Sequence, residues 1–211
     1  LHLCDRRQRQ MCIRDRENRG VQSALLNYSV ENKGVQLGIG NVNTKSNSRG
    51  YQIGIINVST DSTAHQIGCI NLKPDTRVQM IVSGGNANKG SVSIRFKNRF
   101  TYTQIGAGAY YLGTNHPFSV SGFYRAGVYH SLTKKLDLSA DIGYYHIESL
   151  DNKNQGFPAR LYALEPRISL EYSLTKKFGL FVSGGYGWTR TYKGNQAFDK
   201  KMVIEAGMVL F

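Results

Sequence analysis

The chain lacks the residues and runs that build helical proteins. Its 211 residues include only 4 Pro, 3 Cys and 1 Trp, and 19% of them are charged. Segments rich in Ala, Leu and Glu are nearly absent, and no stretch approaches the roughly 18 apolar residues of a transmembrane helix. Any association with a membrane would therefore have to come from strands.

Glycine and aromatic residues are plentiful, with 23 Gly, 13 Tyr and 9 Phe. Aromatic side chains favour pleated surfaces and glycine favours tight turns. The length suits one sizeable domain. The composition therefore predicts an all-β chain.

Residues 1–20 differ from the rest because they carry six Arg, two Cys and no alternation of apolar and polar residues. The run Met11–Arg16, with the ten residues before it, resembles translated sequencing-adaptor DNA. We therefore set residues 1 to about 17 aside in predicting the fold. Residues 1–20 are expected to be a non-native or disordered segment.

Positive charge is spread along the chain. Lysine and arginine number 27 against 14 acidic residues, and without residues 1–20 the balance is 21 minus 11, or +10. Because these residues form no cluster, no nucleic-acid partner is predicted. No His or Cys group has the spacing of a metal site, and Cys69 falls in a strand pattern as a small side chain. We predict neither metal nor cofactor.

A short repeat fills residues 21–72. Its four units are VQSALLN (21–27), VQLGIGN (35–41), YQIGIIN (51–57) and HQIGCIN (65–71), with Gln second and Asn seventh in each. The spacing of 14, 16 and 14 residues suits one strand and a turn per unit. These units resemble the Gly-Val-Gln-Leu-Gly-type surface repeats of bacterial, Bacteroidota-like outer-membrane barrel proteins. The resemblance implies a cell-surface or outer-membrane setting and no activity.

A longer repeat relates SLTKKLDLSADIGYY (131–145) to SLTKKFGLFVSGGYG (173–187). Each copy predicts a strand, a tight Lys-Lys turn and a second strand. The long polar loops at 114–118, 151–159 and 193–200 fall at the other strand ends. Short turns on one rim and long loops on the other are typical of outer-membrane barrels.

Alternation along these strands predicts two surfaces. In residues 161–174 the even positions are mostly aliphatic or aromatic, whereas Glu165, Arg167 and Glu171 are odd. Ionic residues on the polar parity are expected to face the lumen, namely Arg95, Lys97, Arg125, Asp137, Asp141, Glu165, Arg167 and Glu171. Aromatic residues near strand ends are expected to form an interfacial girdle, namely Tyr144, Tyr162, Tyr172, Tyr186, Trp188 and Tyr192.

These patterns predict that residues 21–211 form one antiparallel, up-and-down transmembrane β-barrel of about twelve strands. Residues 21–98 would supply short Gln/Asn repeat strands, and residues 99–211 longer hairpins ending at Phe211. Strands are expected to start near Val21, Gly34, Gly50, Ala64, Arg77, Gly90, Arg99, Ser119, Leu136, Arg160, Phe178 and Lys201.

The favoured function is a non-enzymatic bacterial outer-membrane protein, either structural and surface-exposed or a narrow pore. Its expected partners are outer-membrane lipid and the barrel-assembly machinery during insertion. One alternative is an adhesin whose Gln-to-Asn units stack as a parallel β-solenoid, with only the C-terminal half in the membrane. Another is a lipid-modifying enzyme, but its best candidates, His130 and Ser131, are adjacent and would point to opposite faces of a strand. No catalytic residue is predicted.

Overall fold

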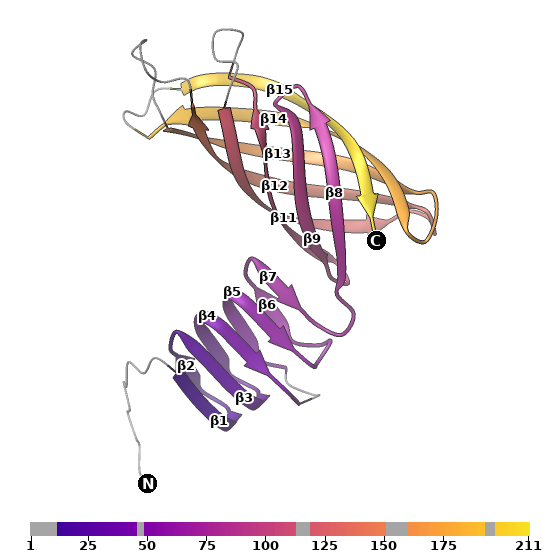
Figure 1. The fold of residues 1–211 in the computed structure, drawn as a ribbon. Coiled ribbons are helices and arrows are strands. Elements are labelled where there is room, and N and C mark those ends of the chain that lie inside the picture. The colour runs from indigo at the N-terminus through magenta and orange to yellow at the C-terminus, as the bar shows by residue number, and fades with distance from the viewer. Residues whose placement is uncertain (1–11, 46–48, 113–118, 151–159, 193–196) are drawn as a thin grey trace. The chain divides into compact units, whose positions relative to one another are not determined.

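The computed structural model describes residues 12–45, 49–112, 119–150, 160–192 and 197–211, and within them the chain is all-β. It divides into two compact units, residues 1–76 and 77–211 (Figure 1). No helix in the described ranges is long and apolar enough to cross a membrane.

Residues 77–211 form a closed barrel of eight antiparallel strands, in which β8 pairs with both β9 and β15. Every strand has a paired neighbour on both sides, and the pairing that closes the barrel joins Glu205–Leu210 of β15 to Met80–Gly85 of β8. Its strands are β8 (Arg77–Gly85), β9 (Asn88–Lys97), β10 (Thr101–Tyr110), β11 (Ser119–Ser131), β12 (Leu136–Ser149), β13 (Arg160–Ser173), β14 (Phe178–Thr191) and β15 (Ala197–Leu210).

The two rims of the barrel differ. The rim at which β8 begins and β15 ends carries three short connections, at residues 98–100, 132–135 and 174–177. The other rim carries the connections at 86–87, 111–118, 150–159 and 192–196. The predicted loops at 114–118 and 151–159 lie outside the described ranges, and so do residues 193–196 of the third; residues 197–200, also predicted as loop, belong to β15. We call the two ends the short-turn rim and the loop rim.

Residues 12–72 form a separate sheet in which all pairing is parallel. Gln36 lies opposite Gln52, and Asn41 opposite Asn57, so like residues stack on like. The strands of this parallel unit are β1 (Cys12–Asn18), β2 (Val21–Ser23), β3 (Leu26–Asn32), β4 (Val35–Asn43), β5 (Tyr51–Ser59), β6 (His65–Ile67) and β7 (Ile70–Leu72). Part of the segment that we set aside is thus a strand, β1.

Two amide ladders run through the parallel unit. Each Gln of the repeat donates from Nε2 to the Oε1 of the Gln before it, with distances of 2.9, 3.0 and 2.9 Å. Each Asn donates to the next one at 2.9, 2.8 and 2.8 Å. Most of these side chains are buried; Gln36, Gln52, Asn41 and Asn57 are each 0% exposed. The ladders therefore satisfy amides that would otherwise be costly to bury.

The glycine between Gln and Asn is required by the stacking. A Cβ on Gly54 would lie 2.1 Å from the carbonyl oxygen of Gly38 in the neighbouring repeat. No side chain fits at that distance. Three of the four units therefore carry glycine at this position, Gly38, Gly54 and Gly68, so that the backbones can approach; the first unit carries Ala24.

The prediction of about twelve barrel strands is wrong, because the barrel has eight. The four repeat strands at 21–72 pair in parallel and lie outside it. Alternation with a period of two is the same in parallel and antiparallel sheets, so it did not fix strand direction. In-register parallel pairing is the arrangement that aligns identical Gln and Asn side chains into ladders. The all-β, antiparallel up-and-down barrel itself is confirmed for residues 77–211.

Candidate functional site

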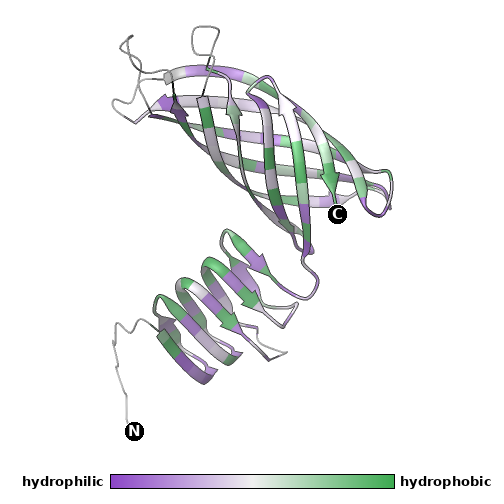
Figure 2. Ribbon diagram, viewed as in Figure 1, coloured by the Kyte–Doolittle hydropathy of each residue, from purple (hydrophilic) through white to green (hydrophobic). Residues whose placement is uncertain are grey.

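The barrel has an apolar outer wall and a charged interior. On its outside, Ile142 is 55% exposed, Ile168 61% and Met202 65%, whereas Glu165 is 0% and Arg167 2% exposed. Apolar and polar residues alternate along the barrel strands (Figure 2). Water-soluble proteins bury their apolar side chains, so this distribution is inverted.

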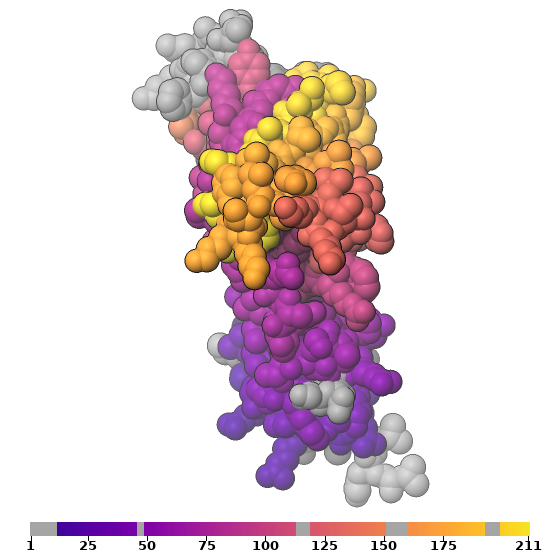
Figure 3. Space-filling view, turned by 90° about the vertical axis from the view of Figure 1, so that its right-hand side faces the viewer, coloured from indigo at the N-terminus to yellow at the C-terminus, as the bar shows by residue number. Residues whose placement is uncertain are grey.

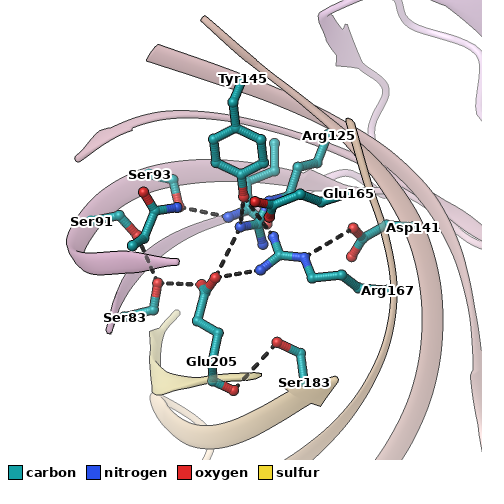
Figure 4. A network of polar contacts seen from close by, with 12 residues as sticks. Ser83, Ser91, Ser93, Arg125, Asp141, Tyr145, Glu165, Arg167, Ser183 and Glu205 are labelled. Carbon is teal, nitrogen blue, oxygen red and sulfur yellow. Dashed lines mark hydrogen bonds and ion pairs between the residues drawn. The ribbon is translucent and has the colours of Figure 1, made fainter. Parts of the chain in front are cut away.

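Glu205 on β15 is the centre of the interior network (Figure 4). It accepts hydrogen bonds from Arg125 at 3.1 Å, from Ser83 at 2.6 Å, and from Arg167. Arg167 also donates to the hydroxyl of Tyr145 at 2.9 Å. Arg125 and Arg167 lie on β11 and β13, neither of which neighbours β15, so these bonds cross the interior.

A second ionic group lies nearer the short-turn rim. Arg95 donates to Glu171 at 2.6 Å, and Lys97 pairs with Asp137 at 2.7 Å. Lys97 also lies 3.6 Å from Glu171. These contacts join β9 to β12 and β13, which are not its neighbours.

An apolar layer fills the interior toward the loop rim. Leu161 and Ile147 are both 0% exposed and pack in a cluster with Tyr110 and Phe123. Tyr110 donates to Glu165 at 3.0 Å, which links this layer to the ionic groups. Together with the two ionic groups, this layer fills the interior with side chains, as expected for a barrel of eight strands.

The structure brings together all eight residues expected to face the lumen. Six are at most 6% exposed, and the side chains of Asp137 and Asp141 are 20% and 4% exposed. Sequence reasoning missed Glu205, Tyr145 and Tyr110. Glu205 had a usable signal, since it lies on the parity opposite to the apolar face of Ile204. Tyr145 and Tyr110 lie near strand ends, where aromatic residues are expected at a membrane interface, but both are buried.

Five of the six girdle residues gather near the loop rim on the outer wall. Tyr162 stacks on Tyr144 and packs on Tyr192, with ring centroids 6.3 and 5.3 Å apart. Tyr186 and Trp188 form an edge contact at 5.2 Å. Tyr172 lies near the opposite rim, opposite Leu136 and Leu180.

The spacing of these aromatic residues matches the thickness of an apolar band. Tyr162 and Tyr172 are ten positions apart on β13. Ten residues of strand extend about 33 Å, and a tilt of about 40° reduces this to about 25 Å along the barrel axis. That value is about the height of the lipid-facing band of outer-membrane barrels.

The described residues contain no group of three or more His, Cys, Asp or Glu that could hold a metal ion. The positions of His130 and Ser131 do not support the enzyme alternative. His130 pairs in register with Leu138, which is exposed on the outer wall, while Ser131 pairs with Asp137. The two side chains therefore belong to opposite faces of β11.

No family model matches the chain, and no curated protein matches it. Two solved structures are similar in fold. One is a de novo designed transmembrane β-barrel, with a TM-score of 0.43 and 15% identity over 66% of this chain and 97% of that one. The other is Neisserial surface protein A (NspA), with a TM-score of 0.38 and 12% identity over 63% of this chain and 92% of that one. Both scores are below 0.5, so the description of the barrel rests on its own strand pairing.

Proposed function

We propose that this protein is a non-enzymatic barrel of the bacterial outer membrane that anchors the parallel unit to the membrane. The observation that carries the proposal is the inverted distribution of side chains, with Ile168 61% exposed on the wall and Glu165 0% exposed inside. Strands of 9 to 14 residues are long enough for a bilayer, which needs about 9 to 11.

The filled interior favours an anchor over a pore. Arg125, Arg167 and Glu205 meet across the middle of the barrel, and an apolar layer with Leu161 and Ile147 lies beside them. Water and solutes would have to displace buried ion pairs to pass. Breaking such pairs without replacing the partner costs several kcal/mol, so we expect no steady conductance.

Chain topology favours the periplasmic side for the parallel unit. β7 ends at Leu72, and the chain enters β8 at Arg77 on the short-turn rim. In outer-membrane barrels the short turns face the periplasm and the long loops face outward. The parallel pairing supports the solenoid part of the adhesin alternative, but this topology argues against display of that unit at the cell surface.

Refolding of the full chain into phospholipid vesicles tests the proposal. We expect a heat-modifiable shift on gels, membrane-bound protein after flotation, and closed planar bilayers in single-channel recordings. Recovery of folded protein in the soluble fraction, with no gel shift, would contradict the barrel anchor. A stable unitary conductance would contradict the filled interior and would support the pore alternative.

Protease added to intact cells tests the orientation. The repeat segment 21–72 should be protected until the outer membrane is opened, whereas a tag inserted in the 151–159 loop should be cleaved at once. Cleavage of both in intact cells would support surface display instead.

A further inference from the structure

The short-turn rim carries only basic charge among its ionic turn residues. The turns 98–100, 132–135 and 174–177 hold Arg99, Lys134, Lys135, Lys176 and Lys177, and Arg77 begins β8 at the same rim. None of these turns contains Asp or Glu. We call these six residues the basic rim.

The charges of the basic rim are exposed and uncompensated. All six residues are exposed, and within the described ranges no ion pair joins any of them to a carboxylate. By contrast, Arg160 at the loop rim pairs with Glu148 at 3.1 Å. The three turns therefore present charge of one sign, which attracts anions.

One cavity at this rim is lined by four residues of the basic rim. They come from segments that lie far apart in the sequence. Arg77, Lys134, Lys135 and Lys176 border a cavity of about 590 Å³ that Leu174 and Phe211 also line. The turns at 132–135 and 174–177 project side by side in Figure 3, in salmon and orange. The cavity thus offers several cations and two apolar side chains to a single ligand.

Each of the three turns also carries one large exposed apolar side chain next to its cations. Phe100 is 63% exposed beside Arg99, Leu132 is 50% exposed near Lys134, and Leu174 is 45% exposed near Lys176. An apolar side chain that enters the acyl region and a cation at the level of the phosphates are the pattern of a membrane interface. A soluble anion such as free phosphate has no apolar part that could contact these three side chains.

We propose that the basic rim binds the headgroups of anionic phospholipids in the leaflet that surrounds the short turns, with the cavity of Arg77, Lys134, Lys135 and Lys176 as the main headgroup site. This inference rests on the proposed membrane anchor and names the lipid class that the anchor recognises. The phosphate accepts hydrogen bonds from the ammonium and guanidinium groups, while Leu174 and Phe211 contact the start of the acyl chains.

The test is lipid binding to the full chain folded in a zwitterionic detergent, measured by native mass spectrometry with phosphatidylglycerol or phosphatidylcholine. We expect phosphatidylglycerol to bind at least tenfold more tightly than phosphatidylcholine. In the quadruple variant K134Q/K135Q/K176Q/K177Q this preference should fall to below threefold. The matching K→R variant should retain it.

A charge-matched control removes four cations from strand ends at the loop rim, K89Q/R160Q/R190Q/K200Q, and should keep the preference of the wild type. Equal binding of both lipids by the wild type, or equal loss in the two quadruple variants, would overturn the proposal. Displacement of the lipid by millimolar inorganic phosphate would also overturn it, because the site would then read phosphate alone. The heat-modifiable gel shift of each variant reports the barrel separately, so loss of lipid preference with an intact shift is distinct from failure of the membrane anchor.

Discussion

Arg95 on β9 and Glu171 on β13 form an ion pair with an N to O distance of 2.6 Å, although their strands are not neighbours in the barrel. The side chains of both are at most 7% exposed. The pair ties opposite walls of the barrel together. Removing one partner would leave the other charge buried.

We expect Glu171→Gln to destabilise the barrel by about 3 to 5 kcal/mol, because it leaves the buried Arg95 without its counter-charge. Urea unfolding in detergent micelles, followed by tryptophan fluorescence and by the gel shift, measures the change. The control is Glu148→Gln, which removes an exposed pair with Arg160 and should cost about 0 to 1 kcal/mol. Similar losses in the two variants would mean that the interior pair is solvated.

Ile168 lies near the middle of β13 on the outer wall. If this wall faces lipid, Ile168→Lys should lower the free energy of unfolding in bilayers by about 2 to 4 kcal/mol. Thr175→Lys, in an exposed turn on the short-turn rim, should have little effect. Equal stability of both variants in vesicles would show that the wall at Ile168 is in contact with water.

Gly54→Ala should disrupt the parallel unit and leave the barrel folded. The added methyl would meet the Gly38 carbonyl oxygen at 2.1 Å, so the two repeats could no longer approach. Hydrogen exchange should show lost protection across residues 35–72 with an unchanged gel shift. Gly20→Ala is the matched control, because a Cβ there meets nothing within 4 Å. Full protection in Gly54→Ala would contradict the stacked register.

Glu31 gives the parallel unit a pH-sensitive contact. Hydrogen bonds from Lys33 and Lys45, at 2.7 and 2.8 Å, lower the pKa of its carboxyl from 4.5 to about 2. A lowered pKa contributes stability that is fully present above the unfolded value of 4.5 and is lost as the pH falls toward 2. Hydrogen exchange of residues 26–45 should therefore quicken between pH 4.5 and 2 in the wild type, relative to its intrinsic rate.

The variant Glu31→Gln should show a smaller change over the same pH range, because it has no charge to lose. High salt should reduce the difference between wild type and variant, since both lysines are exposed and Glu31 is partly exposed. An identical pH dependence in the two proteins would remove Glu31 as its source.

Several barrel strands were predictable from local signals. The predicted starts at Arg77, Ser119, Leu136, Arg160 and Phe178 coincide with those of β8, β11, β12, β13 and β14. Alternation and tight turns are encoded within a few residues, so a single sequence reveals them. The direction of strand pairing in the repeat region could not be predicted in this way, because parallel and antiparallel sheets show the same alternation.

The sequence predicts which residues face the interior of the barrel, but it does not predict which of them contact one another. Alternation assigns Arg95 and Glu171 to the inner face, but their 76-residue separation in sequence gives no sign that they meet. That contact depends on how the sheet closes and on the stagger of its strands. Glu205 shows the same limit, because nothing within its own strand indicates that it meets Arg125 and Arg167.

The amide ladders make the parallel unit modular in length. Each repeat of 14 or 16 residues adds one rung of about 4.8 Å and the same three kinds of contact, namely a Gln bond, an Asn bond and a glycine approach. Gain or loss of a whole repeat leaves every remaining rung in register, whereas loss of a single residue moves the amides of one rung out of line. Related chains that differ in the number of repeats would then differ in the length of the parallel unit and keep the same barrel.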